Sequence, residues 1–125
     1  MTSKYNAKLI LAGDHNNLEV APGADVTFDA EHLGRQPFQP VRLEIEAPSG
    51  WLVLGLRFNR HEQLAMSGVP SEVFAPEAYN SELVMPVVRP GEHVELVMRN
   101  NSTTPGKATA QLLGNILLRV RRGQP

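Results

Sequence analysis

The sequence predicts an all-β protein in which two antiparallel sheets pack face to face as a β-sandwich of about eight strands. Short apolar or alternating segments recur along the chain with turn residues between them. No window keeps the 3.6-residue periodicity of an amphipathic helix. The run Trp51–Phe58 (WLVLGLRF) is apolar on both faces of a strand. It therefore needs cover on both sides, which the rest of the chain would supply in a small β-sandwich or barrel.

Length and composition set the domain organisation. The 125 residues fit a single domain, residues 1–125, and we expect residues 1–7 and 122–125 to be flexible termini. Cysteine is absent, which excludes disulfides, a thiol nucleophile and a thiolate metal site. Twelve basic and thirteen acidic residues give a net charge of -1, which makes nucleic acid an improbable partner.

The first residues are polar and lack the apolar core of a signal peptide. No apolar run approaches the roughly 20 residues that cross a bilayer. We therefore expect synthesis and folding in the cytoplasm, with no membrane insertion.

The N-terminal third of the chain contains candidate strands at residues 8–12, 18–20 and 25–30. The turn residues GDHNN at 13–17 predict a hairpin between the first two. Residues 25–30 alternate between apolar and polar side chains, as a half-buried strand does. The glycine and prolines within residues 31–40 predict an irregular crossover.

Residues 41–47 alternate most regularly, and the tight connection at 47–50 leads directly into the Trp51–Phe58 strand. This spacing predicts an antiparallel hairpin between the two strands. After a break come candidate strands at 81–88, His93–Asn100, 108–114 and 116–120, with Pro86 placing the first of them at an edge or bulge. The predicted core consists of Val41, Leu43, Ile45, Leu52, Leu54, Leu56, Val94, Leu96 and Met98.

The longest stretch without strand periodicity spans residues 67–80. Its apolar side chains, Val69, Val73, Phe74 and Tyr79, are too many for a loop that only crosses water. They predict either a contact with another subunit or a cap over the open end of the sandwich. We take these four residues as the candidate protein interface.

A search for chemistry finds no catalytic, cofactor-binding or metal-ligating constellation. The four histidines His15, His32, His61 and His93 stand in different segments without ligand spacing. Residues 14–17 lack the alternating oxygen ligands of a calcium loop. No nucleophile or phosphate-binding motif occurs. We therefore expect a protein that is not an enzyme and that needs no cofactor.

Two polar segments have both a functional and a structural interpretation. Residues 100–103 (NNST) contain overlapping glycosylation sequons, but without a secretory signal they are better explained as turn residues. Arg119, Arg121 and Arg122 are typical of the solvated face of a terminal strand rather than of a nucleic-acid site.

Residues 90–102 (PGEHVELVMRNNS) and 108–114 (ATAQLLG) carry a resemblance to a family type. They resemble the closing strands of small jelly-roll and β-sandwich virion proteins of bacterial viruses. A P-G turn starts a strand that ends in N-N-S, and a last strand ends in L-x-G. Pro22-Gly23, the P-V-R-L-E-I strand at 40–45 and the long apolar central strand follow the same order. The resemblance covers roughly residues 18–114.

The resemblance implies a jelly roll that serves as a capsid, capsid-decoration or spike-associated subunit of a virus particle. Its partners would be itself, as a homo-oligomer, or other virion proteins, and no catalytic residues are carried over. The alternative is a cytoplasmic β-sandwich module that binds a small ligand, a glycan or another protein. A virion subunit needs neighbours along several edges, whereas a binding module needs one concave pocket.

Overall fold

A computed structural model describes residues 5–11, 19–59, 61–64, 68–78 and 82–117, with only the backbone described for 61–64. Within these residues the chain forms eight strands and one short 3-10 turn, and no α-helix. The prediction of an all-β protein is confirmed. The elements are β1 (Ala7–Leu11), β2 (Asp25–Glu31), β3 (Phe38–Glu46), β4 (Trp51–Phe58), β5 (His61–Leu64), β6 (Val69–Pro70), η2 (Ser71–Phe74), β7 (His93–Asn100) and β8 (Thr109–Ile116).

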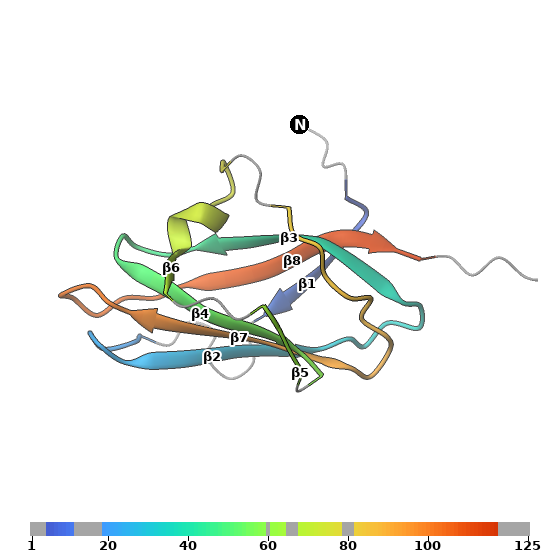
Figure 1. Cartoon of the computed structure of the whole chain (residues 1–125), viewed down its shortest axis with the longest axis horizontal. Helices are drawn as coiled ribbons and strands as arrows, with labels where there is room; N and C mark the ends of the chain where they lie inside the picture. The colour runs from blue at the N-terminus through green and yellow to red at the C-terminus, as the bar shows by residue number, and fades with distance from the viewer. Residues whose placement is uncertain (1–4, 12–18, 60, 65–67, 79–81, 118–125) are drawn as a thin grey trace, which may run out of the picture.

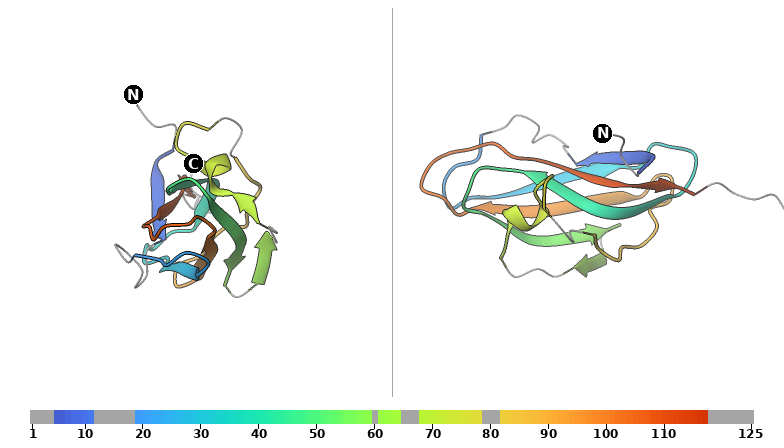
Figure 2. Two further views of the ribbon diagram at one scale, coloured as in Figure 1. Left: turned by 90° about the vertical axis from the view of Figure 1, so that its left-hand side faces the viewer. Right: turned by 90° about the horizontal axis from the view of Figure 1, so that it is seen from above.

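The strands form two sheets that lie one over the other (Figures 1 and 2). The smaller sheet has the order β1-β8-β3, and the larger sheet has the order β2-β7-β4-β5 with β6 paired to β4. Every strand pair is antiparallel. The prediction of two antiparallel sheets is therefore confirmed.

The hydrophobic core fills the space between the sheets. Both sheets contribute side chains that are fully buried, and alternation along β7 places Val94, Leu96 and Met98 there as predicted. The apolar side chains without measurable exposure in the described part of the chain are Leu43, Trp51, Val53, Leu56, Val94, Leu96, Met98 and Leu112.

A β-bulge in β4 changes which of its faces is buried. The register with β7 shifts between Val53 and Gly55, so that Leu54 is an extra residue on this strand. Before the bulge the odd-numbered side chains are buried, and after it the even-numbered ones are. A single inserted residue reverses the period-two alternation. Of the predicted core residues Leu52, Leu54 and Leu56, only Leu56 is therefore fully buried.

A second bulge does the same in β3. Its register with β8 shifts between Pro40 and Arg42, at Val41. Phe38 and Pro40 are buried before the shift, and the odd-numbered residues that follow are buried after it. Three residues predicted for the core are consequently only partly buried: Val41, Leu52 and Leu54.

The connection at residues 47–50 is not a hairpin turn. Strand β3 belongs to the smaller sheet and pairs with β8, whereas β4 belongs to the larger sheet and pairs with β7. The chain therefore crosses from one sheet to the other, with Gly50 at φ 95° in the left-handed region. The predicted pairing is wrong because a short turn sequence does not distinguish a hairpin from an arch between sheets.

The predicted hairpin between residues 8–12 and 18–20 is also absent from the described pairing. Strand β1 pairs with β8, and Val20 forms an isolated bridge with Gly106. Its turn, residues 13–17, lies outside the described residues, as do 1–4 and 122–125 of the predicted flexible termini. Of the remaining N-terminal residues, Asn6 accepts a hydrogen bond from Ile116 N–H (3.0 Å) and Ala7 begins β1.

The two predicted strands at the C-terminal end are a single strand within the described residues, β8, and residues 118–120 lie outside them. No helix in the described part of the chain has both the length and the apolar character needed to cross a membrane.

Candidate interaction surface

The segment 82–88 lies along the free side of β3 without forming a continuous strand. Isolated bridges join Glu82 to Arg42 and Val88 to Phe38. Leu83 N–H also donates to the carbonyl of Val41 (2.8 Å). Between these attachments stands Pro86, which has no N–H to donate, so the pairing is interrupted where the sequence predicted an edge or bulge.

The four candidate interface residues have different environments. Val69 lies in β6, where it is opposite Val53 and packs partly against the core. Phe74 is only 3% exposed and belongs to the core of its own chain, whereas Val73 is 47% exposed. Tyr79 lies outside the described residues. Phe74 therefore fits the capping role, and among the described members of the set Val73 is the one that a partner can reach.

The difference between Phe74 and Val73 follows from the 3-10 turn that contains both. Side chains three residues apart lie on the same side of a 3-10 helix, and Ser71 and Phe74 are both buried. Val73 then points away from them. The turn ends at Ala75, which is extended because the next residue is Pro76.

Arg42 of β3 holds the segment that follows this turn. Its Nη2 donates to the carbonyl oxygens of Ala75 (3.1 Å), Pro76 (2.8 Å) and Ala78 (3.2 Å). Its Nε lies 3.6 Å from a carboxylate oxygen of Glu44. The alternation of β3 correctly predicts that Arg42 points out of the sheet. It gives no sign of this role, because the partners are backbone groups far along the chain.

Val84 is the second exposed apolar residue in this region, and sequence reasoning missed it. It is 98% exposed, while Leu83 packs against the core and Met85 is buried. Gln39 Nε2 donates to the carbonyl of Met85 (2.8 Å), which holds the segment in place. We call residues 71–78 and 82–88, with Val73 and Val84 exposed, the β3-side surface.

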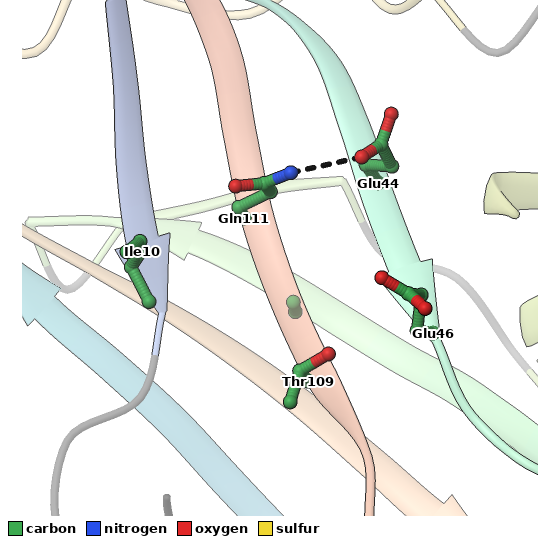
Figure 3. Close-up of a pocket in the computed structure, with 6 residues that line it drawn as sticks. Ile10, Glu44, Glu46, Thr109 and Gln111 are labelled. Carbon is green, nitrogen blue, oxygen red and sulfur yellow. Dashed lines mark hydrogen bonds between the residues drawn. The ribbon is translucent and has the colours of Figure 1, made fainter. Parts of the chain in front are cut away.

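Three open hollows adjoin this surface and the outer face of the smaller sheet: one beside η2, one at Gln111, and a third of about 550 Å³ lined by Tyr5 and Lys8 among others. The first, of about 470 Å³, lies between the end of β3 and the η2 segment. Glu46, Glu72, Glu77 and Lys107 are its charged lining residues. The second, of about 190 Å³, is shallow and lies on the outer face, where Gln111 Nε2 donates to Glu44 (2.8 Å; Figure 3).

The described aromatic side chains other than Tyr5, which lines the third hollow, line none of the three. Each is buried in the core, so none of them offers a platform on which a sugar ring could stack. These residues are Phe28, Phe38, Trp51, Phe58 and Phe74.

The buried polar residue Asn100 holds the loop 100–106 from within. Its Nδ2 donates to the carbonyls of Val20 (2.8 Å) and Thr104 (3.0 Å). Its Oδ1 accepts from the N–H (3.1 Å) and the hydroxyl (2.6 Å) of Ser102. The interpretation of this segment as hydrogen-bonded turn residues is confirmed, and Asn100 has no exposed surface.

The two histidines whose side chains the structure describes, His32 and His93, have different environments. His32 is buried, with Nε2 2.6 Å from the carbonyl of Gln36, and His93 is exposed near Glu31 (3.9 Å). His15 lies outside the described residues, and only the backbone of His61 is described. In the part of the chain that the structure describes, no three histidine or carboxylate side chains could hold a metal ion together.

On the outer face of the larger sheet, Arg99 forms a two-pronged ion pair with Asp25 (2.7 and 3.3 Å). The hydrogen bond from this guanidinium holds the pKa of the Asp25 carboxyl below its usual value. Both groups are exposed, so the pair contributes little to stability.

Comparisons of the chain with protein-family models, with characterised proteins and with solved structures find no match.

Proposed function

We propose that the chain is a non-enzymatic structural subunit of a bacterial virus particle, a capsid or capsid-associated protein that acts through protein-protein interfaces. In this proposal its fold is a jelly roll and its location is the virion. The observation that carries the proposal is the way the strands pair, together with the resemblance of residues 18–114 to small virion proteins.

A jelly roll is a long antiparallel hairpin of eight strands wound into two sheets, an architecture found in viral capsid domains. In such a hairpin the first strand pairs with the last, the second with the seventh, the third with the sixth and the fourth with the fifth. The pairs β1–β8, β2–β7 and β4–β5 follow this scheme. Segment 82–88, bonded to β3, takes the place of the sixth strand. This correspondence supports the jelly roll.

The polar groups described inside the chain support a structural role. Three side chains donate hydrogen bonds to backbone carbonyls of connecting segments: those of Asn100, Arg42 and Gln39. These bonds fix the shape of the surface. The β3-side surface then presents Val73 and Val84 on segments that are held in place. Apolar side chains on a preorganised surface are typical of a protein interface, because little entropy is lost on binding.

The test is the assembly of the purified full chain. Size-exclusion chromatography with light scattering over a range of concentrations, followed by electron microscopy, should show oligomers or shells. The double variant Val73→Ser/Val84→Ser should weaken association while the midpoint of thermal unfolding stays nearly unchanged, because both side chains are exposed.

Leu33→Ser is the matched control, since Leu33 is also highly exposed but lies in the β2–β3 connection. It should associate like the wild type. A chain that stays monomeric at high concentration and binds no protein from the same genome would contradict the proposed function.

The alternative, a β-sandwich module that binds a small ligand, a glycan or a protein, is favoured by the hollow beside η2. Its carboxylates Glu46, Glu72 and Glu77 outnumber its one lining cation, Lys107, which favours a small cationic ligand. Titration with a polyamine, followed by amide chemical shifts, tests this. Saturable shifts in a monomeric chain, lost in Glu72→Gln, would replace the assembly proposal with this one.

A further inference from the structure

The outer edge of β2 is unpaired among the described residues. Strand β2 ends the larger sheet and pairs only with β7. At its two ends, Ala24 C=O accepts from Asn100 N–H (3.0 Å) and His32 N–H donates to Glu92 C=O (2.9 Å). Even-numbered residues thus turn their backbone groups toward β7. By the alternation of an antiparallel strand, the odd-numbered residues of Asp25–Glu31 turn theirs to the free edge.

The side chains of β2 are patterned along this edge. Val26 and Phe28 are buried between the sheets, whereas Asp25, Asp29 and Glu31 lie on the outer face. Asp25 is neutralised by Arg99. A strand added to this edge would need apolar side chains facing inward and, to match the carboxylates, basic side chains facing outward.

The β2 edge carries an unbalanced negative charge at Asp29. In register Asp29 stands opposite Glu95, and two like charges placed directly across a strand pair destabilise it. The only cation near Glu95 in the described residues is Arg57, at 3.9 Å. Asp29 itself has no ion-pair partner in the described part of the chain.

These charges disfavour pairing of β2 with β2 of a second copy. An antiparallel pair centred on Phe28 would place Asp25 of each copy opposite Glu31 of the other, so that carboxylate would face carboxylate at both ends of the pair. A partner strand with basic residues at alternate positions has no such conflict.

The chain itself carries a segment with the required pattern. Residues 118–122 read Leu-Arg-Val-Arg-Arg, with apolar residues alternating with Arg119 and Arg121 and no acidic residue. We propose that this C-terminal segment of one copy adds as a strand to the β2 edge of a second copy, an inference that rests on the proposed assembly function. In an antiparallel pairing with β2, Leu118 and Val120 would face the core side, with Arg119 opposite Glu31 and Arg121 opposite Asp29.

Strand addition of this kind draws its affinity from main-chain hydrogen bonds and its specificity from the side chains. Guanidinium and carboxylate groups add paired, charge-assisted hydrogen bonds. The competing explanation is that the carboxylates only protect an exposed edge from pairing. The two explanations differ in what charge reversal does.

The experiment uses two full-length variants. The edge variant carries Asp29→Arg and Glu31→Arg, and the tail variant carries Arg119→Glu and Arg121→Glu. Each alone places like charges across the contact, so we expect its dissociation constant for self-association to rise at least about tenfold in sedimentation velocity. An equimolar mixture should associate again, because each edge then meets a tail of opposite charge.

The controls Glu19→Arg and Arg35→Glu change exposed charges elsewhere and should associate like the wild type. Circular dichroism and the thermal midpoint establish that both variants fold. Two folded variants that associate as the wild type does, or a mixture that fails to associate, would overturn the inference while the assembly function stands. A monomeric wild type would overturn both.

Cross-linking identifies the copy that supplies the C-terminal segment. The sequence has no native cysteine, so only the introduced cysteines can form a disulfide. Thr27→Cys in one chain and Gly123→Cys in another, which lie opposite each other on the outer face when Arg121 pairs with Asp29, should form a disulfide-linked dimer under oxidation. A chain that carries both substitutions and closes an intramolecular disulfide at high dilution, with no cross-linked dimer from the mixture, would overturn the inference of a second copy.

Discussion

The loop 100–106 and the segment 71–78 are both irregular, but they are held in opposite ways. The loop is organised from inside by Asn100, whose hydrogen bonds go to Val20, Ser102 and Thr104. The segment is held by another element, through the hydrogen bonds of Arg42 of β3, and by the burial of Phe74 in the core.

The two segments differ in the apolar surface that they leave exposed to a binding partner. In the loop 100–106 the side-chain amide of Asn100 forms hydrogen bonds with the polar groups around it, so these groups need no partner from another protein. The segment 71–78 has its backbone fixed by another element, which leaves Val73 turned toward solvent. A surface that is rigid and apolar is the one suited to contact, because fixing it on binding costs little further entropy. Three substitutions test this comparison.

Phe74→Ala should have the largest effect on stability. Removal of a buried phenylalanine side chain costs about 3–5 kcal/mol through lost burial and the cavity left behind. Chemical denaturation of the isolated chain measures it, with Val73→Ala as the neighbouring control within about 0.5 kcal/mol of the wild type. A near-neutral Phe74→Ala would mean that the segment is not anchored to the core.

Asn100→Ala should cost less, about 2–3 kcal/mol. It removes the four hydrogen bonds of the Asn100 side chain, each worth roughly 0.5–1.5 kcal/mol net, while the carbonyls of Val20 and Thr104 keep Gly106 N–H (3.1 Å) and the Ser102 hydroxyl (2.9 Å) as donors. Denaturation at equilibrium gives the value. Asn101→Ala is the matched control, because Asn101 is exposed and its substitution should be nearly neutral. Equal effects at both positions would refute the internal anchoring of the loop.

Arg42→Met should have the smallest effect, about 1.5–2 kcal/mol, from the loss of charge-assisted hydrogen bonds to carbonyls that water can partly replace. Its signature is local: hydrogen exchange should accelerate within residues 71–78 and stay unchanged in 100–106. Arg42→Lys should recover only part of the protection, since one ammonium cannot reproduce the reach of the guanidinium. Uniform acceleration in both segments would remove the distinction between them.

The limits of strands β4 and β7 could be predicted from the sequence to the residue. Their patterns are local: a continuous apolar run between turn residues, and a regular alternation in Val94, Leu96 and Met98. The burial of Leu54 could not be predicted, because a bulge depends on how β4 lies against β7. The role of Phe74 could be stated only as one of two alternatives, since a buried and an exposed loop phenylalanine look alike in sequence.

The amino-acid sequence by itself determined that the chain is all-β, where its clearest strands lie and which turn is closed by asparagine and serine. These follow from side-chain periodicity and local hydrogen bonding, which act over a few residues. Only the tertiary structure decided that β3 and β4 lie in different sheets, that Arg42 reaches the backbone of 75–78, and that Val84 is left exposed. Those outcomes depend on which distant segments compete for each sheet edge, and that choice minimises the free energy of the whole chain rather than of any local stretch.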